Sequence, residues 1–399
     1  MKRVTILLWF CLSVFFAFAN DGVFYAAGNQ LIPITETDIS VKKEVLTINR
    51  VGDHLEVTVY YEFFNPVDEK ELLVGFEAKS AYNGRDPMST FPAHPHIRNF
   101  KVVLNGETLS YEIAHVDRGD YDDDGKYVPS QYYKKGKFQS WSQQQIKDTM
   151  AAWDFYDDMP VDYVYHFKAK FRPGLNIIQH TYDFDLSSSV EEEFYFPYVL
   201  TAANRWANHQ IDNFQLNINM GPRESFYIFP EFFKSPDEWS ILGKGIITTD
   251  TTWWLTEGKE TPVFHIQEGG LIFRKANFHP EGELRIHKRN EWYMASWLWG
   301  INDDANAESI LNAFKDQYFP ILLSDEQTKE SRFYTMFTPE QRRILKNIPF
   351  AYRGYVFKDK ELQNYFESTD WYLPNPKYNA TMGTLTAEEK KWVEFWSEK

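Results

Sequence analysis

The clearest chemical signal in the sequence is an acidic loop that begins at Asp120. Asp120, Asp122 and Asp124 place carboxylates at positions 1, 3 and 5 of a calcium-binding loop, and Gly125 occupies its turn position. Position 12 falls on Gln131, where an EF-hand has a bidentate Glu, and the preceding segment has the pattern of a strand. The sequence therefore disfavours an EF-hand and leaves two interpretations open: a calcium loop of another architecture, or a solvated acidic turn.

The same loop contains an adhesion tripeptide, Arg118-Gly119-Asp120. Three residues carry little information, and ordinary turn chemistry favours the same residue types. A calcium-dependent adhesin is therefore an alternative interpretation, and it depends on the loop from Asp120 to Gln131.

Four histidines are candidates for metal binding or catalysis. In a strand, His94 and His96 would share a face, as paired metal ligands do. Pro95 between them disfavours a strand, and the sequence identifies no third ligand. We expect His166 and His180, which fall in strand patterns, to make hydrogen bonds at the sheet surface rather than to take part in catalysis.

The sequence lacks the common motifs of catalysis. It has no phosphate loop, dinucleotide fingerprint, HExxH or GxSxG. Its 57 acidic residues supply many carboxylate pairs, but glycoside cleavage needs a defined separation across a cleft. We therefore predict no catalytic residues, and no cofactor apart from the calcium that the acidic loop would bind. A hydrolase of cell-wall glycan or peptide is the alternative, because catalytic residues need not be adjacent in sequence.

Aromatic residues are unusually frequent and have two interpretations. The chain has 13 Trp, 24 Tyr and 33 Phe, with clusters at Trp253-Trp254 and from Trp292 to Trp299. Exposed rings could stack on sugars, which would suit a glycan partner. Aromatic side chains also favour strands and large cores, and we favour that interpretation for most of them.

Length and charge limit the class of partner. The chain has 399 residues, 43% of them hydrophobic, so it can bury a large core and form two domains. A formal net charge of -15 disfavours nucleic acids and anionic membrane surfaces, because like charges repel. The net charge does not exclude small acidic ligands, because a local basic patch can override the total charge.

Residues 1–19 have the pattern of a cleaved export signal. Lys2 and Arg3 precede an apolar stretch, and Ala17-Phe18-Ala19 fits the cleavage site. The strongly apolar run is about 13 residues, shorter than the roughly 20 that span a membrane. Cleavage would remove Cys11, the single cysteine, and leave 40 basic against 57 acidic residues, a net charge of -17. We therefore expect an exported protein, periplasmic or extracellular, without disulfides and without a membrane span after cleavage.

Residues 20–301 are predicted to form an antiparallel β-sandwich domain, because short alternating stretches recur there. Asn105-Gly106 supplies the turn of a hairpin within residues 100–113. An irregular insert is expected at about 117–160, with one helix at Gln143–Trp153. The remaining strands are predicted at residues 55–63, 72–76, 163–170, 176–184, 214–220, 262–267, 271–275 and 283–288.

Residues 302–399 are predicted to form a small α-helical domain. Helical spacing begins at Ala305, and two capping boxes mark helix starts, one at Thr338 with Gln341 and one at Thr386 with Glu389. The expected fold class is thus mainly β, with a separate helical C-terminal domain.

The string from Asn347 to Phe357, followed by Tyr365-Phe366 and Trp371-Tyr372, resembles the YARHG domain of exported bacterial proteins over about residues 335–399. Phe350, Tyr352 and Arg353 stand where the name-giving motif has Tyr, Arg and His, so a role of that His is not transferable. The resemblance implies an exported protein and a small module, but no reaction. We expect Gly354 to permit a close backbone approach and the aromatics to fill a core.

The N-terminal part resembles an uncharacterised family of exported bacterial β-domain proteins. The resemblance rests on residues 20–22, 28–31, 43–46 and 60–66, and it implies no catalytic residue. Together these patterns predict a non-catalytic protein of the bacterial cell envelope with a binding or structural role. Its expected partner is another envelope protein or a glycan.

Overall fold

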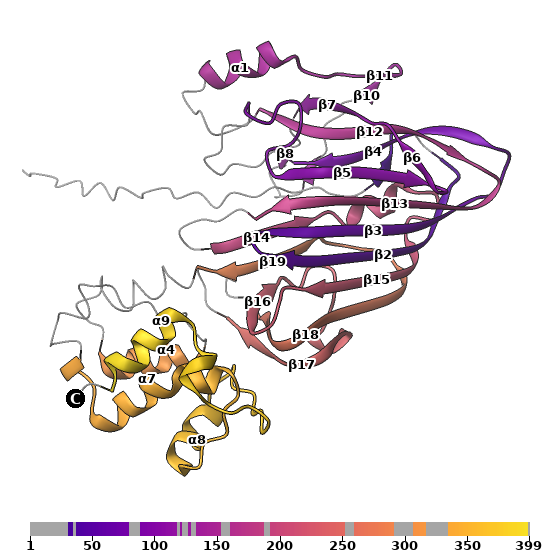
Figure 1. Ribbon diagram of the computed structural model, residues 1–399. Helices are drawn as coiled ribbons and strands as arrows, with labels where there is room; N and C mark the ends of the chain where they lie inside the picture. The colour runs from indigo at the N-terminus through magenta and orange to yellow at the C-terminus, as the bar shows by residue number, and fades with distance from the viewer. Residues whose placement is uncertain are drawn as a thin grey trace, which may run out of the picture.

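A computed structural model describes residues 31–34, 37–79, 88–117, 120–121, 127–128, 133–152, 160–186, 192–251, 259–290, 306–316 and 334–397. Strands make up most of the described residues before residue 290, and helices make up most of those after residue 306 (Figure 1). The predicted fold class is confirmed. The predicted export signal lies outside the described residues. Among the helices of the described part, none is long and apolar enough to cross a membrane.

The smaller of the two main sheets has four antiparallel strands. Its order is β1 (Leu31–Pro33), β4 (Lys70–Ala78), β12 (Val161–Phe171) and β7 (Glu112–Asp117). Helix α1 (Gln143–Ala152) buries Ile146 and Met150 in the core of this part, close to the predicted range.

The larger sheet has eleven strands. One pair of neighbours, β2 and β15, runs parallel, and the other pairs are antiparallel. The order is β14 (Glu192–Tyr198), β19 (Leu284–Arg289), β16 (Glu224–Ile228), β18 (Thr261–Phe278), β15 (Ile211–Asn219), β2 (Ser40–Val51), β3 (His54–Asn65), β13 (Gly174–Asp185), β5 (Ile97–Leu104) and β6 (Glu107–Leu109), with β17 (Trp239–Asp250) paired to β18.

The two sheets enclose one apolar core. In β3, alternate residues from Leu55 to Phe63 are buried, while Glu56, Thr58, Tyr60 and Glu62 are not, as the alternation predicts. The buried side chains share a cluster with apolar residues of β4 and β12 in the smaller sheet. The antiparallel sandwich is thus held mainly by burial of aliphatic and aromatic side chains.

The predicted hairpin forms, with one difference at its end. Asn105 and Gly106 have φ angles of 51° and 90°, as a tight two-residue turn requires. Strand β6 ends at Leu109, and the chain crosses to the smaller sheet as β7 from Glu112. The predicted second strand is therefore split between two sheets.

Two predicted strands, 262–267 and 271–275, are one long strand, β18. Gly269 and Gly270 continue the pairing with β17, where Gly269 lies opposite Gly243. A Cβ atom on Gly269 would lie 1.7 Å from the Leu242 carbonyl oxygen, so the close approach of β17 requires glycine. The local sequence suggested a break because glycine pairs usually mark turns.

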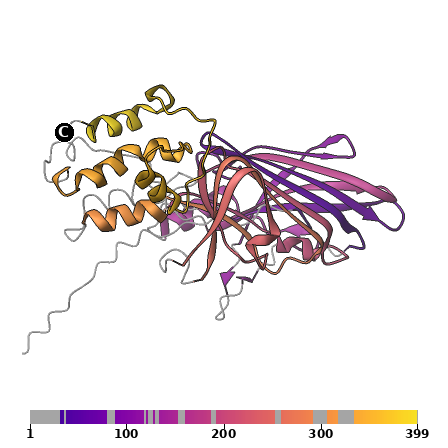
Figure 2. The same cartoon turned by 90° about the horizontal axis from the view of Figure 1, so that it is seen from below.

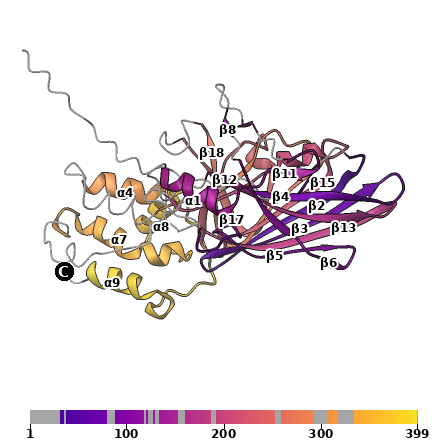
Figure 3. The same cartoon turned by 90° about the horizontal axis from the view of Figure 1, so that it is seen from above.

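The helical part has a core of its own, separate from the sandwich core. Its elements are α4 (Ala307–Asp316), α7 (Pro339–Tyr352), α8 (Lys360–Glu367), the 3-10 turn η4 (Met382–Thr384) and α9 (Ala387–Phe395). Both predicted capping boxes form, at Thr338 with Gln341 and at Thr386 with Glu389. The helices lie at one end of the β part (Figures 2 and 3).

Short elements complete the described structure. They are β8 (Asp120–Tyr121), β9 (Tyr127–Val128), β10 (Tyr133–Lys134), β11 (Lys137–Phe138), η1 (Thr201–Arg205) and η2 (Pro236–Glu238). The strand pairs β8–β9 and β10–β11 lie within the predicted insert and form two small sheets of their own.

Candidate functional site

The predicted calcium loop lies mostly outside the described residues. Asp120 belongs to β8, which pairs with β9, while Asp122, Asp124, Gly125 and Gln131 fall outside the described part. Within the part of the chain that the structure describes, no group of three or more His, Cys, Asp or Glu side chains could hold a metal ion. The calcium site stays a prediction from sequence.

His94 and His96 use their rings to hold the backbone. His94 Nε2 lies 2.8 Å from the Lys79 carbonyl oxygen, and its Nδ1 accepts a hydrogen bond from the His96 backbone N–H at 3.1 Å. His96 Nδ1 lies 2.8 Å from the Asp185 carbonyl oxygen. Burial lowers the pKa of His94 to about 3, so its ring is neutral at pH 7. The arrangement is a structural clamp on this loop.

The prediction for His180 is wrong, because the residue lies inside the sandwich. Its ring is fully buried against Tyr61 and Phe76, and neither ring nitrogen has a hydrogen-bond partner among the described residues. Burial lowers its pKa to about 3. His166 is half-buried and stacks on Phe138 at a centroid distance of 4.2 Å.

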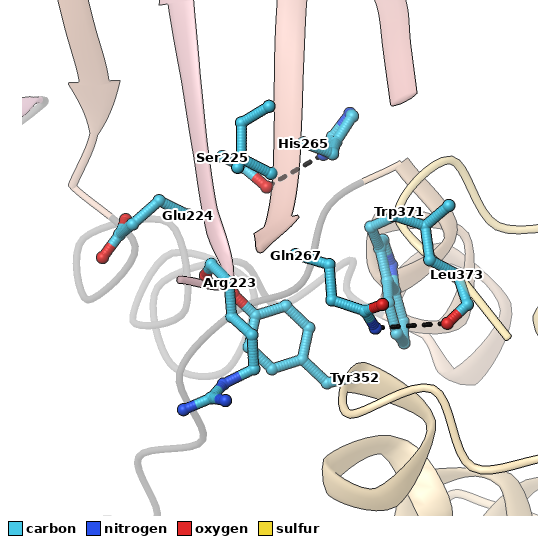
Figure 4. A pocket seen from close by; sticks show the side chains of 9 residues that line it. Arg223, Glu224, Ser225, His265, Gln267, Tyr352, Trp371 and Leu373 are labelled. Carbon is cyan, nitrogen blue, oxygen red and sulfur yellow. Dashed lines mark hydrogen bonds between the residues drawn. The ribbon is translucent and has the colours of Figure 1, made fainter. Parts of the chain in front are cut away.

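A cleft lies where the sandwich meets the helical part (Figure 4). Strands β16 and β18 form one wall, and Tyr352, Trp371 and Leu373 form the other. The space inside it is about 10 Å³, close to the minimum that one water molecule needs. In this conformation the cleft therefore has no room for a molecule much larger than water.

A chain of three polar side chains begins at Ser225 and His265, which line the cleft, and continues to Thr248. Ser225 Oγ lies 2.8 Å from His265 Nδ1, and His265 Nε2 lies 2.9 Å from Thr248 Oγ1. The three residues come from neighbouring strands, with Ser225 directly opposite His265 in the register. Burial lowers the pKa of His265 to about 4, so the ring is a neutral link between two hydroxyls at pH 7.

Hydrogen bonds cross the cleft between the two parts, including one from Lys244 Nζ to the Leu373 carbonyl oxygen at 3.4 Å. The Tyr352 hydroxyl donates to the Arg223 carbonyl oxygen. Gln267 Nε2 donates to the Leu373 carbonyl oxygen at 3.2 Å, and Lys244 Nζ donates to the Pro374 carbonyl oxygen. These bonds fix the loop after Trp371 against β17 and β18.

Charged groups beside the cleft are paired within the chain. Glu224, which lines the cleft, lies 2.8 Å from Lys288 Nζ and 3.4 Å from Arg50 Nη1. Asp250 accepts hydrogen bonds from Tyr227 and Arg289. Across the junction, burial and the charge of Asp250 raise the pKa of Asp370. The ion pairs and hydrogen bonds of this region thus link neighbouring strands to one another.

Exposed apolar side chains gather on the outer face of the larger sheet, at the end of β3 and the start of β13. Phe64 is 39% exposed, its register partner Leu175 is 56% exposed, and Ile177 is 39% exposed. Val67, in the turn after β3, is 46% exposed. We refer to Phe64, Val67, Leu175 and Ile177 as the apolar patch.

Polar side chains face inward at the same end. Asn176 is fully buried between the exposed Leu175 and Ile177, and its Nδ2 donates to the carbonyl oxygens of Arg172 and Gly174 at 2.8 and 3.1 Å. Asn65, next to Phe64, is fully buried and donates to the Phe171 carbonyl oxygen at 3.3 Å. The usual distribution of apolar and polar residues is therefore inverted here on two neighbouring strands.

Comparison with known proteins identifies the helical part. Residues 321–398 match the YARHG domain family. The chain carries a C-terminal YARHG domain. No curated protein sequence matches the chain.

Among solved structures, one from Legionella pneumophila subsp. pneumophila str. Philadelphia 1, titled a "putative nutrient binding protein", aligns over 94% of this chain and 98% of its own length. Its identity is 16% and its TM-score 0.46.

Arg353 has a structural role in the YARHG domain. Its guanidinium makes two hydrogen bonds to the Glu389 carboxylate, at 2.6 and 2.7 Å, and both side chains are nearly buried. The same carboxylate accepts from the Thr386 backbone N–H at 2.7 Å, so the pair joins the end of α7 to the start of α9. Arg353 therefore fastens two helices at the position where the name-giving motif has His.

Gly354 permits a close approach of the backbone at Leu373, as its place in the aromatic string predicted. Its φ angle is +81°, and a Cβ atom there would lie 2.3 Å from the Leu373 carbonyl oxygen. Its own carbonyl oxygen accepts from the Asn375 backbone N–H at 2.7 Å. The glycine thus places the Leu373 segment, which forms one wall of the cleft.

Sequence reasoning did not identify the cleft or the apolar patch. Ser225 and His265 are distant in sequence and meet only through strand pairing. The patch had a signal, because Leu175-Asn176-Ile177 alternates in the wrong phase relative to the rest of β13. Interpreting it required knowledge of which face is buried.

Proposed function

We propose that the protein is a non-catalytic binding protein exported to the bacterial cell envelope, where it holds its partner on the outer face of the larger sheet. The observation that carries the proposal is the inverted burial at the ends of β3 and β13. Contiguous exposed apolar side chains are uncommon on proteins without a partner, whereas isolated ones are ordinary.

Burial of the polar neighbours strengthens this argument. Asn65 and Asn176 lie inside with hydrogen-bonded side chains, while Phe64 and Leu175 lie outside. The buried amides hold the turns at this end through their hydrogen bonds, whereas the exposed apolar pair leaves hydrocarbon in water without such a role among the described contacts. Departures from folding-optimal patterns are expected at functional surfaces.

Export is part of the proposal. It is supported by the YARHG domain at residues 321–398 and by the export-signal pattern of residues 1–19. We propose a periplasmic or extracellular location on this basis. If the acidic loop at Asp120, Asp122 and Asp124 binds calcium, the binding protein would be a calcium-dependent adhesin.

A hydrolase is the second candidate, and one specific observation favours it. Ser225 Oγ lies 2.8 Å from His265 Nδ1, as a nucleophile and its base would. Against it, the cleft holds about one water molecule, and the lowered pKa of His265 makes it a weak base. Release of wall fragments by the purified protein, abolished by Ser225→Ala, would favour the hydrolase over the binding protein.

The test of the proposed function is retention on bacterial envelope material. The purified exported protein is mixed with washed envelopes, containing membranes and wall, and the bound fraction is measured after sedimentation. We expect the double variant Phe64→Ser, Leu175→Ser to bind at least about tenfold more weakly, since two apolar contacts are removed.

Leu242→Ser is the matched control. Leu242 is 55% exposed on β17, away from the apolar patch, so its substitution should leave binding unchanged. Equal binding of the double variant and the parent would contradict the proposed function. Parallel loss of binding in Leu242→Ser would show a general effect of surface polarity instead, which also contradicts it.

A further inference from the structure

We infer that the outer face of the larger sheet binds an uncharged glycan chain; this rests on the proposed function and names the ligand class of the same surface. The inference comes from rows of amide and hydroxyl side chains that the strand register aligns beside the apolar patch.

The register places outward residues of four strands in rows. Thr47 of β2 pairs with Thr58 of β3 and with Asn217 of β15, and Thr58 pairs with Thr181 of β13. The row two residues away aligns in the same manner. We call these two rows the platform, and its members are Asn217, Thr47, Thr58 and Thr181 in one row and Gln215, Val45, Tyr60 and Gln179 in the other.

The platform faces solvent, with Gln179 exposed and the other seven residues half-buried. None of its eight residues is buried, while the residues that alternate with them in the four strands are buried in the core. Neighbouring strands are about 4.8 Å apart, so four strands span about 14 Å. That width exceeds one sugar ring and suits several units of a chain.

The chemistry of the platform matches sugar hydroxyls. Each amide offers donors and acceptors together, and each hydroxyl offers both, as a sugar hydroxyl does. Some of these groups are already oriented: Gln215 Nε2 donates to Asn217 Oδ1 at 2.8 Å, and Asn217 Nδ2 donates to Thr47 Oγ1 at 3.1 Å. Orientation before binding lowers the entropic cost of holding a ligand.

The platform residues themselves suit an uncharged ligand. The platform residues carry no formal charge at pH 7, although the whole chain carries -15. On the same face, Lys43 lies 3.7 Å from Glu62, and Lys42 lies 2.8 Å from Asp212, so these charges offset each other. An acidic polymer would meet the repulsion of the whole molecule, which the nearest cations, Lys101 beside Thr181 and Arg274 beside Gln215, offset only locally.

Two aromatic rings continue the platform into the apolar patch. Tyr60 and Phe64 lie on the outward side of β3, and Gln179 and Ile177 lie on the outward side of the adjacent β13. The ammonium groups of Lys43 and Lys42 lie 5.8 and 5.9 Å from the Tyr60 and Phe64 ring centroids. Rings of this kind can cover the apolar faces of sugars while the platform binds their edges.

The test measures binding of chitohexaose, an uncharged hexamer of N-acetylglucosamine, by calorimetry on the full exported chain. The variant Thr58→Val, Thr181→Val removes two platform hydroxyls and retains β-branched shapes. We expect its affinity to fall about tenfold, as for two hydrogen bonds of ordinary strength, with an unchanged melting temperature. Thr249→Val, at an exposed position on β17, is the matched control and should bind like the parent.

The outcomes separate the two proposals. Three results would each overturn the glycan inference. The parent chain does not bind chitohexaose, or the Thr58→Val, Thr181→Val variant binds chitohexaose as tightly as the parent, or the parent binds acidic polygalacturonate more tightly than chitohexaose. If Phe64→Ser, Leu175→Ser still loses envelope binding in that case, the proposed function stands with another ligand. If the patch variant instead converts a dimer of this chain to a monomer, the face is a contact between copies and the glycan inference is wrong.

Discussion

The cleft between the sandwich and the YARHG domain and the outer face of the larger sheet use polar and apolar residues in opposite ways. In the cleft, Ser225, His265 and Gln267 already hold partners within the chain. On the outer face, Phe64 and Leu175 leave apolar surface in water. The polar residues of the cleft thus serve the fold, while the outer face of the larger sheet leaves apolar side chains available for a partner.

Among the ion pairs, breaking the one between Arg353 and Glu389 in the YARHG domain has the largest expected effect on stability. Arg353→Ala leaves the nearly buried Glu389 without its bidentate partner, so we expect the free energy of unfolding to fall by about 3–5 kcal/mol. Urea unfolding followed by tryptophan fluorescence measures this. Arg343→Ala, which breaks a largely exposed pair with Asp359, is the control and should cost less than about 1 kcal/mol. Equal losses would show that Arg353 does not fasten α7 to α9.

Lowering the pH should reduce the free energy of unfolding through the buried histidines, by somewhat less than the loss of the Arg353–Glu389 pair. The pKa of His180 is about 3 in the folded protein, below the usual 6.5, so its stability contribution is lost as pH falls below 6.5. At pH 5 the loss reaches about 2 kcal/mol. Between pH 7 and pH 5, we expect the free energy of unfolding to fall by about 2 kcal/mol less in His180→Phe than in the parent. Urea unfolding at each pH measures this difference. Identical pH profiles would contradict the buried, neutral state of His180.

Calcium would add a third region to the comparison. If the acidic loop binds the ion, calcium at about ten times its dissociation constant stabilises the fold by about 1.4 kcal/mol. We expect millimolar calcium to raise the melting temperature and Asp122→Ala to abolish the increase. No response of the parent chain to calcium would contradict the loop prediction.

Two neighbouring phenylalanines give a sharp contrast, with the smallest expected change at Phe64. Phe64→Ala should change the free energy of unfolding by no more than about 0.5 kcal/mol, because Phe64 faces outward. Phe63→Ala should cost about 3–5 kcal/mol, because Phe63 is fully buried. Thermal or urea unfolding of the pair measures both. A large loss in Phe64→Ala would mean that the apolar patch serves the fold.

Local features of the fold could be predicted from sequence because their causes are local. The capping boxes at Thr338 and Thr386, the turn at Asn105-Gly106 and the alternation of β3 each depend on a few adjacent residues. The YARHG domain was predicted from its aromatic string for the same reason.

Non-local features could not be predicted in this way. The crossing from β6 to β7, the parallel pairing of β2 with β15 and the continuity of β18 through Gly269 depend on which strands meet. His180 seemed a surface residue because a polar ring in an alternating strand usually faces water. The candidate surfaces depend on the same pairing, since the platform exists only once four strands are in register.

Hydroxyl-radical footprinting with and without chitohexaose tests most directly that the outer face, and not the cleft, is the binding site. We expect oxidation of Phe64, Tyr60 and Leu175 to fall when the glycan is present, while oxidation of Tyr352 and Trp371 is unchanged. Protection of Tyr352 and Trp371 with Phe64 still fully reactive would place the ligand between the sandwich and the YARHG domain and contradict the account.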